Sequence, residues 1–90
     1  MHIKLAPSVI KALKKIKQKD KRFSEKIEKQ LTLFASNPKH PSLRLHKIQT
    51  STGETWSISI TMSIRMLYTL LDEDKAYFIK IGTHEEVYKK

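Results

Sequence analysis

The order of hydrophobic and polar positions changes its period near the middle of the chain. Residues 2–6 alternate between polar and apolar side chains, which predicts a short N-terminal strand. In residues 8–19, and again after Asp20, apolar side chains recur every three or four positions, as in amphipathic helices. Asp20 can cap the second helix, and Asn37-Pro38 end it because the residue before a proline avoids the helical conformation. The first half is therefore predicted to be a strand followed by two helices.

Beyond Pro41 the apolar positions alternate with a period of two, which is typical of strands. Residues 64–71 are apolar nearly throughout, so this segment is predicted to be a central strand buried on both faces. The segment 56–62 has one apolar face and one face of small polar side chains. The predicted strands and connections are residues 43–46, a polar loop at 49–54, residues 56–62, a tight connection near Ser63, residues 64–71, a charged turn at 72–75, and residues 76–81.

Short connections between these strands favour antiparallel neighbours, because a parallel pair needs a long crossover. The order of strand, helix, helix and then three or four strands is typical of the α+β class. We expect two N-terminal helices, an αα-hairpin, packed on one face of a twisted, mainly antiparallel sheet of four to five strands. Ninety residues suffice for one modest core, so residues 1–90 are predicted to form a single domain.

The charge of the chain is large and unevenly distributed. Its 18 Lys and Arg outnumber its 9 Asp and Glu, which gives a net charge of +9. Residues 1–48 hold 13 basic and 3 acidic side chains, whereas residues 49–90 hold 5 basic and 6 acidic ones. This imbalance indicates a polyanionic partner: nucleic acid, an acidic membrane face or an acidic protein. The alternative is a lysine-rich helix face that serves solubility alone.

The composition excludes several classes of protein. No apolar run approaches the ~18–20 residues that span a bilayer. No apolar segment ahead of a small-residue cleavage site indicates a secretory signal. The chain has no cysteine, which excludes disulfides, thiolate nucleophiles and cysteine-bound zinc. We therefore expect a cytoplasmic protein without a membrane-spanning segment, and among the polyanionic partners above we do not expect a membrane.

The C-terminal stretch holds the first candidates for chemistry. Gly82 ends the last predicted strand, and Thr83 followed three residues later by Glu86 fits a capping box that starts a helix. In that helix His84 and Tyr88 are four residues apart and share a face. Histidine can give or take a proton near neutral pH. The alternative is a surface histidine beside a tyrosine that packs on the body of the domain.

Arg65 is the single charged residue in the most apolar predicted strand. A guanidinium stays charged at ordinary pH, so burying it without a partner is very costly. Either it pairs with a carboxylate such as Asp72 or Glu54, or it faces a cleft that receives an anion. Asp and Glu are scarce in the predicted strands, which favours the cleft. There a planar guanidinium can hold a phosphate through two parallel hydrogen bonds.

The strand predicted at 43–46 adds two basic side chains. Arg44 and His46 are two residues apart in it and should point to the same side. The small polar face of the following strand would leave room beside them.

Metal binding is a weaker interpretation of the histidines. His46 and His84 could meet near Glu85 or Glu86, but no two histidines have a ligand spacing typical of helices or hairpins. The chain has no glycine-rich phosphate loop and no serine in a nucleophile-elbow motif. We therefore expect neither a metal nor a cofactor.

Four segments carry the likeness to a known family. They are Leu43-Arg44-Leu45-His46-Lys47-Ile48, Trp56-Ser57-Ile58-Ser59-Ile60, Arg65-Met66-Leu67-Tyr68 and Ile81-Gly82-Thr83-His84-Glu85-Glu86-Val87-Tyr88. In this order, and over essentially the whole chain, they resemble the RelE/ParE toxin superfamily, above all its RelE and YafQ branch. The resemblance implies a small basic toxin of a type II toxin–antitoxin pair. Its RelE-like members enter the ribosomal A site and cut messenger RNA there without a metal.

The resemblance also implies which residues correspond to the family's site. Arg65 matches the arginine of one of its strands. His84 and Tyr88 match the histidine and the aromatic residue of its C-terminal turn. His46 aligns with a catalytic histidine of the YafQ-like branch, and Lys47 stands where the YoeB-like branch has a glutamate.

From these matches we expect His46, helped by Lys47, to take the proton of an RNA 2′-hydroxyl that attacks the adjacent phosphate. Arg65 would stabilise the transition state, His84 would protonate the leaving 5′-oxygen, and Tyr88 would orient His84 or stack on a base. Basic residues would contact RNA phosphates and make binding sensitive to salt. The expected RNA-binding residues are Arg44, Lys47, Lys11, Lys14 and Lys15.

Two other functions stay open at this point. A ParE-like inhibitor of DNA gyrase would have no chemical need for the His46, Arg65 and His84 set, and a plain RNA-binding module would use only the basic helices. Ser59 also departs from the family pattern, because many relatives carry Arg or Lys near this position. The implied partners are the ribosome, messenger RNA and a cognate acidic antitoxin, whose helix or strand would lie across the helical hairpin and the sheet edge.

Overall fold

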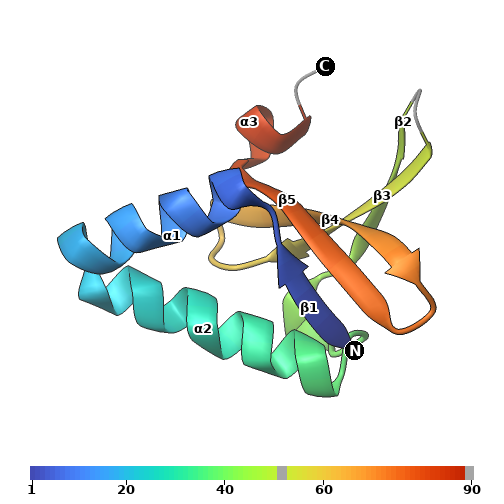
Figure 1. Ribbon diagram of the computed structural model, residues 1–90, viewed down its shortest axis with the longest axis horizontal. Coiled ribbons are helices and arrows are strands. Elements are labelled where there is room, and N and C mark those ends of the chain that lie inside the picture. The colour runs from blue at the N-terminus through green and yellow to red at the C-terminus, as the bar shows by residue number, and fades with distance from the viewer. Residues whose placement is uncertain (51–52, 89–90) are drawn as a thin grey trace.

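The structure, a computed structural model, describes residues 1–50 and 53–88. Its elements are β1 (His2–Leu5), α1 (Pro7–Lys19), α2 (Lys21–Ser36), the 3₁₀ helix η1 (Pro41–Leu43), β2 (His46–Thr50), β3 (Gly53–Ser59), β4 (Ile64–Asp72), β5 (Lys75–Thr83) and α3 (His84–Tyr88). The strands form one sheet in the order β1-β5-β4-β3-β2, in which only the pairing of β1 with β5 is parallel among the described residues. The predicted α+β class is confirmed, with α1 and α2 side by side along the sheet (Figure 1).

The two long helices begin where the sequence predicts. Pro7 occupies the first turn of α1, where its missing N–H leaves no hydrogen bond unmade. Asp20 caps α2, and its Oδ1 accepts the backbone N–H of Phe23 at 3.0 Å. Asp20 is also the single residue between the two helices, so the chain reverses direction sharply there. No helix in the described ranges is long and apolar enough to cross a membrane.

The core lies between the helices and one face of the sheet. Phe34 of α2 is fully buried, and its ring centroid lies 4.9 Å from that of Tyr68 and 5.3 Å from that of Phe78. Burial raises the pKa of Tyr68 to about 12, so this phenol stays neutral in the core. The middle of β4 is buried on both faces, as predicted, but Leu70 and Leu71 near its end are exposed.

The predicted strand at 43–46 is wrong over its first three residues. Pro41–Leu43 form η1, Arg44 adopts the left-handed conformation (φ 46, ψ 52), and β2 begins only at His46. A turn is favoured because Pro41 suits a first helical turn and His40 Nδ1 accepts the N–H of Ser42 at 3.1 Å. The expectation that Arg44 and His46 share one side of a strand is therefore wrong as well, because Arg44 lies before β2.

The predicted polar loop at 49–54 is also shorter than expected. β2 and β3 continue the ladder to the pair Thr50–Gly53, so most of the loop belongs to a hairpin. Residues 51–52 of that loop lie outside the described residues. The strand predicted at 56–62 ends earlier, at Ser59, and Met62 is almost fully exposed in the turn that follows. Hydrophobic alternation misplaced both ends because hairpin pairing and the turn near Ser63 decide where this strand starts and stops.

Candidate active site

The candidate site lies on the sheet face opposite α1 and α2. Ser57 pairs with Leu67, and Ser59 pairs with Arg65 across β3 and β4. Paired residues share a face of the sheet, and successive residues alternate, so these four side chains face away from the core that Phe34 fills. The C-terminal helix α3 returns over this second face, where Val87 is buried.

The predicted capping box holds α3. The Thr83 N–H donates to Glu86 Oε1 at 2.8 Å, and the Glu86 N–H donates to Thr83 Oγ1 at 3.2 Å. This confirms the reciprocal pattern expected of a capping box. The hydrogen bond from the Thr83 backbone, followed by one with its side chain, holds the pKa of Glu86 below its ordinary value. The box starts the single helical turn that carries His84 and Tyr88.

Two imidazoles and one phenol lie together beside α3. The ring centroids of His84 and Tyr88 are 4.2 Å apart, as their four-residue spacing predicts. The ring of His46, at the start of β2, lies 6.2 Å from the ring of Tyr88. Both histidines are exposed and the tyrosine is half-buried, so the imidazoles remain open to a ligand while the phenol is held by the protein.

Arg65 is held beside this cluster by neutral oxygen atoms. Its Nε donates to Ser57 Oγ at 2.9 Å, and its Nη2 donates to the Arg44 carbonyl at 2.7 Å and to the Ser57 carbonyl at 3.3 Å. Of the two carboxylates considered from the sequence, Glu54 pairs with Lys47 at 2.8 Å and Asp72 lies 4.0 Å from Lys75. Within the described ranges no carboxylate pairs with Arg65, so its charge is available to an anion.

Ser57 links Arg65 to the phenol of Tyr88, whereas its place in the sequence indicated only a small side chain that leaves space. Its side chain is fully buried, and its Oγ lies 2.6 Å from the hydroxyl of Tyr88 and 2.9 Å from Nε of Arg65. One small hydroxyl therefore fixes two of the predicted site residues. The signal that could have found it was weak: a run of small polar residues at alternate positions beside a strand that holds one arginine.

Arg44 contributes through its backbone. Arg44 has a left-handed backbone conformation, which costs a non-glycine residue roughly 1–2 kcal/mol. Its carbonyl oxygen accepts a hydrogen bond from Nη2 of Arg65. The side chain of Arg44 is exposed, and its predicted contact with RNA stays a prediction. This strained residue is a second feature of the site that side-chain patterns did not indicate.

Other predicted residues lie apart from the cluster. Lys47 forms its ion pair with Glu54 and lies 5.8 Å from the centre of the Trp56 ring, on the opposite side of β2 from His46. The three predicted lysines of α1 are exposed and belong to a helix that packs on the other face of the sheet; they are Lys11, Lys14 and Lys15. Among the described residues no three His, Asp or Glu side chains gather as a metal site would require.

Acidification should loosen α3, because Glu86 has a lowered pKa in the fold. Its carboxylate stabilises α3 at a pH above the ordinary glutamate value of 4.5, and this contribution is lost as the pH falls through the lowered folded-state pKa. We expect the NMR signals of the Tyr88 ring to shift in that acidic window. A Glu86→Gln variant, which cannot titrate, is the control, and an unchanged acid response in it would contradict this role of Glu86.

Residues 3–88 match the model of a known family, the ParE toxin of the type II toxin–antitoxin system parDE. The chain belongs to this family. The predicted resemblance to the RelE/ParE superfamily is thereby confirmed, and the protein is a toxin of the type II toxin–antitoxin class. No curated protein matches the chain.

Solved structures of related toxins share the fold of this ParE-family toxin. The YoeB/ParE toxin from Agrobacterium tumefaciens has a TM-score of 0.77 and 19% identity over 93% of this chain and 99% of that one. The heterotetrameric YoeB–YefM toxin–antitoxin complex from Staphylococcus aureus matches with a TM-score of 0.75 and 21% identity, over 93% of this chain and 97% of that one. The DinJ–YafQ complex from E. coli matches with a TM-score of 0.74 and 19% identity, over 96% of each chain. At identities this low, the likeness to these structures shows a shared fold.

Proposed function

We propose that this ParE-family toxin is a ribosome-dependent endoribonuclease that cuts messenger RNA by attack of the RNA's own 2′-hydroxyl. The observation that carries the proposal is the cluster of His46, His84, Tyr88 and an Arg65 guanidinium that no described carboxylate neutralises. Such a reaction needs a base, an acid and a fixed positive charge, because the substrate supplies its own nucleophile. Ribosomes are cytoplasmic, so the proposed activity belongs there.

In the proposed reaction His46 takes the proton of the 2′-hydroxyl as its oxygen bonds to phosphorus. Arg65 stabilises the charge that gathers on the phosphate oxygens. As the bond from phosphorus to the 5′-oxygen breaks, His84 gives that oxygen a proton. The products are a 2′,3′-cyclic phosphate and a 5′-hydroxyl. Tyr88, held by Ser57, orients the His84 ring beside it.

Primer extension on messenger RNA after induction of the toxin tests the proposed function. We expect discrete cut sites that depend on translating ribosomes. The second candidate, inhibition of DNA gyrase, is favoured by the family match, whose description is that of a ParE toxin. It predicts an SOS response with intact messenger RNA, so the two functions give opposite results in one culture.

Ser57→Ala should lower the cleavage rate about tenfold, because each lost hydrogen bond is worth roughly 0.5–1.5 kcal/mol. The substitution removes the hydroxyl that contacts Arg65 and Tyr88 but changes neither of those two residues. The rate is measured at saturating messenger in a translating extract, beside Ser36→Ala, a control whose serine donates to the Thr32 and Leu33 carbonyls of its own helix α2. Equal rates for the two variants would remove Ser57 from the site.

We also propose that an acidic, amphipathic antitoxin segment silences the toxin. Support comes from the relatives that crystallised with YefM and with DinJ. An apolar groove of about 210 Å³ between α1 and α2 suits such a helix, and Lys14 and Lys17 flank it. The apolar residues that line the groove are Leu5, Ile10, Leu13, Ile27 and Leu31.

The rate of association with the antitoxin should fall as ionic strength rises. Charge steers the encounter between a basic helical pair and an acidic segment. Salt screens that attraction over ~10 Å at 0.1 M. Stopped-flow mixing of the purified pair at several salt concentrations measures this rate. A rate that does not change with salt would mean that the basic half of the chain is not the docking face.

A further inference from the structure

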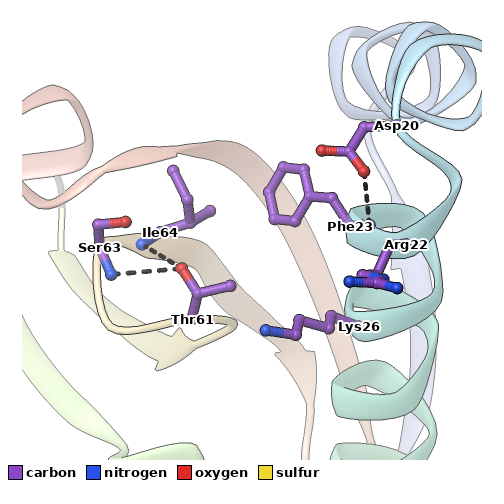
Figure 2. A pocket seen from close by; sticks show the side chains of 7 residues that line it. All are labelled: Asp20, Arg22, Phe23, Lys26, Thr61, Ser63 and Ile64. Atoms are coloured by element: carbon purple, nitrogen blue, oxygen red, sulfur yellow. Dashed lines mark hydrogen bonds between the residues drawn. The ribbon is translucent and has the colours of Figure 1, made fainter.

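A second hollow in the molecule lies between the start of α2 and the turn that joins β3 to β4 (Figure 2). Its volume is about 340 Å³, and we name it the α2 groove. Arg22 and Lys26 line it on the α2 side, and Thr61 and Ser63 line it on the turn side. None of these residues belongs to the cluster described above.

The helical wall of the α2 groove is positively charged. Arg22 and Lys26 are four residues apart, so they project from the same face of α2. Both are exposed, and within the described ranges neither forms an ion pair. The one acidic residue at the groove, Asp20, already accepts the Phe23 N–H as the helix cap. The wall therefore offers two cations to an anionic ligand.

The turn wall offers hydroxyl donors. Thr61 Oγ1 accepts the backbone N–H of Ser63 at 3.3 Å and that of Ile64 at 3.1 Å. A hydroxyl has two acceptor lone pairs and one proton, so with both lone pairs engaged it meets a ligand as a donor. The turn thus complements phosphate oxygens, which only accept hydrogen bonds.

Contacts between α2 and the β3–β4 turn region fix the shape of the α2 groove. Gln30, one helical turn beyond Lys26, donates from Nε2 to the Ser59 carbonyl at 2.8 Å and so ties α2 to the end of β3. Phe23 and Ile64 are half-buried against the core and give the groove an apolar side (Figure 2). A fixed spacing between cations, hydroxyls and an aromatic ring suits a ligand that carries both a phosphate and a planar base.

We propose that the α2 groove binds one nucleotide unit of the messenger RNA, with its phosphate on Arg22 and Lys26 and its base against Phe23. Ser59, the cross-strand partner of Arg65, lies two residues before Thr61, so the groove and Arg65 lie at the same end of the β3–β4 hairpin. The inference rests on the proposed function, because the substrate strand is the RNA that reaches both places. It adds a binding site away from the reacting phosphate.

The test measures RNA binding apart from cleavage. A fluorescent single-stranded RNA of about 12 nucleotides is titrated with His84→Gln toxin at several salt concentrations, and anisotropy gives the affinity. Adding Arg22→Ala and Lys26→Ala should weaken binding about tenfold and reduce the salt slope by about 0.7, because the two cations hold one phosphate and each lost phosphate contact contributes ~0.7. The control pair, Lys4→Ala and Lys39→Ala, removes the same charge from exposed lysines outside the groove.

Each outcome decides a different question. A larger loss of RNA affinity on Arg22→Ala with Lys26→Ala (the groove pair) than on the control pair supports nucleotide binding in the α2 groove. Equal losses overturn it, because only net charge would then matter. If the wild-type toxin leaves messenger RNA intact on translating ribosomes, the proposed function fails, whichever affinity the groove pair shows.

Discussion

Replacing Arg65 with alanine should slow messenger RNA cleavage by about 10²–10³-fold, the usual effect of removing one fixed donor from a transition state. Arg65 is bound through two nitrogen atoms to Ser57 and to the Arg44 carbonyl. Its position is therefore set before substrate arrives. Cleavage is measured as single-turnover decay of a messenger bound to purified ribosomes.

Two controls separate chemistry from folding in this experiment. Arg65→Ala leaves polar groups near Ser57 without a partner at a cost of roughly 1–3 kcal/mol, so a thermal melt must show the variant folded at the assay temperature. Arg65→Lys keeps the charge but lacks the planar fork of donors, and its rate should lie between those of the wild type and Arg65→Ala. A folded Arg65→Ala toxin that cuts at the wild-type rate would exclude Arg65 from the reaction.

His84→Gln should lower the cleavage rate by about 10²–10⁴-fold, because glutamine cannot give a proton to the leaving oxygen. The defect should depend on that oxygen. A messenger with sulfur in place of the 5′-oxygen at the cut has a leaving group that needs no proton. On this substrate His84→Gln should regain most of the wild-type rate.

His46→Gln is the matched comparison, since both histidines are exposed and both neighbour the ring of Tyr88. The loss of a base is not repaired by a better leaving group, so His46→Gln should stay slow on the sulfur substrate. The opposite pattern, with only His46→Gln rescued, would exchange the two roles. Recovery in neither variant would show that proton transfer to the leaving group does not limit the rate.

The parts of the fold that were predicted correctly depend on local signals. Asp20 was recognised as a helix cap because the capping bond to Phe23 spans only three residues. The Thr83 and Glu86 capping box was recognised for the same reason, and it places His84 and Tyr88 together. Interactions this short leave a readable spacing in the sequence.

The parts that were missed depend on contacts between distant segments. The Arg44 carbonyl is 21 positions from the guanidinium that it binds, and its left-handed conformation breaks what looked like a strand. Ser57 reaches Tyr88 across 31 positions, and only the return of α3 over the sheet brings them together. No spacing rule relates such pairs, so neither the bond from Arg65 to the Arg44 carbonyl nor the link from Ser57 to Tyr88 could be read from the chain alone. The residues alone suggested a meeting of His46 and His84 only as a weak metal-binding idea, and the catalytic role expected of His46 came from the resemblance to the toxin family.

The most direct test of the proposed function is a messenger that carries one 2′-deoxynucleotide immediately before the cut site on the ribosome. This single missing hydroxyl should abolish cleavage at that position, because the proposed nucleophile is then absent. The unmodified messenger should yield an upstream fragment with a 2′,3′-cyclic phosphate and a downstream fragment with a 5′-hydroxyl. Cleavage of the deoxy-substituted messenger at the normal rate, or a 5′-phosphate on the downstream fragment, would contradict attack by the 2′-hydroxyl.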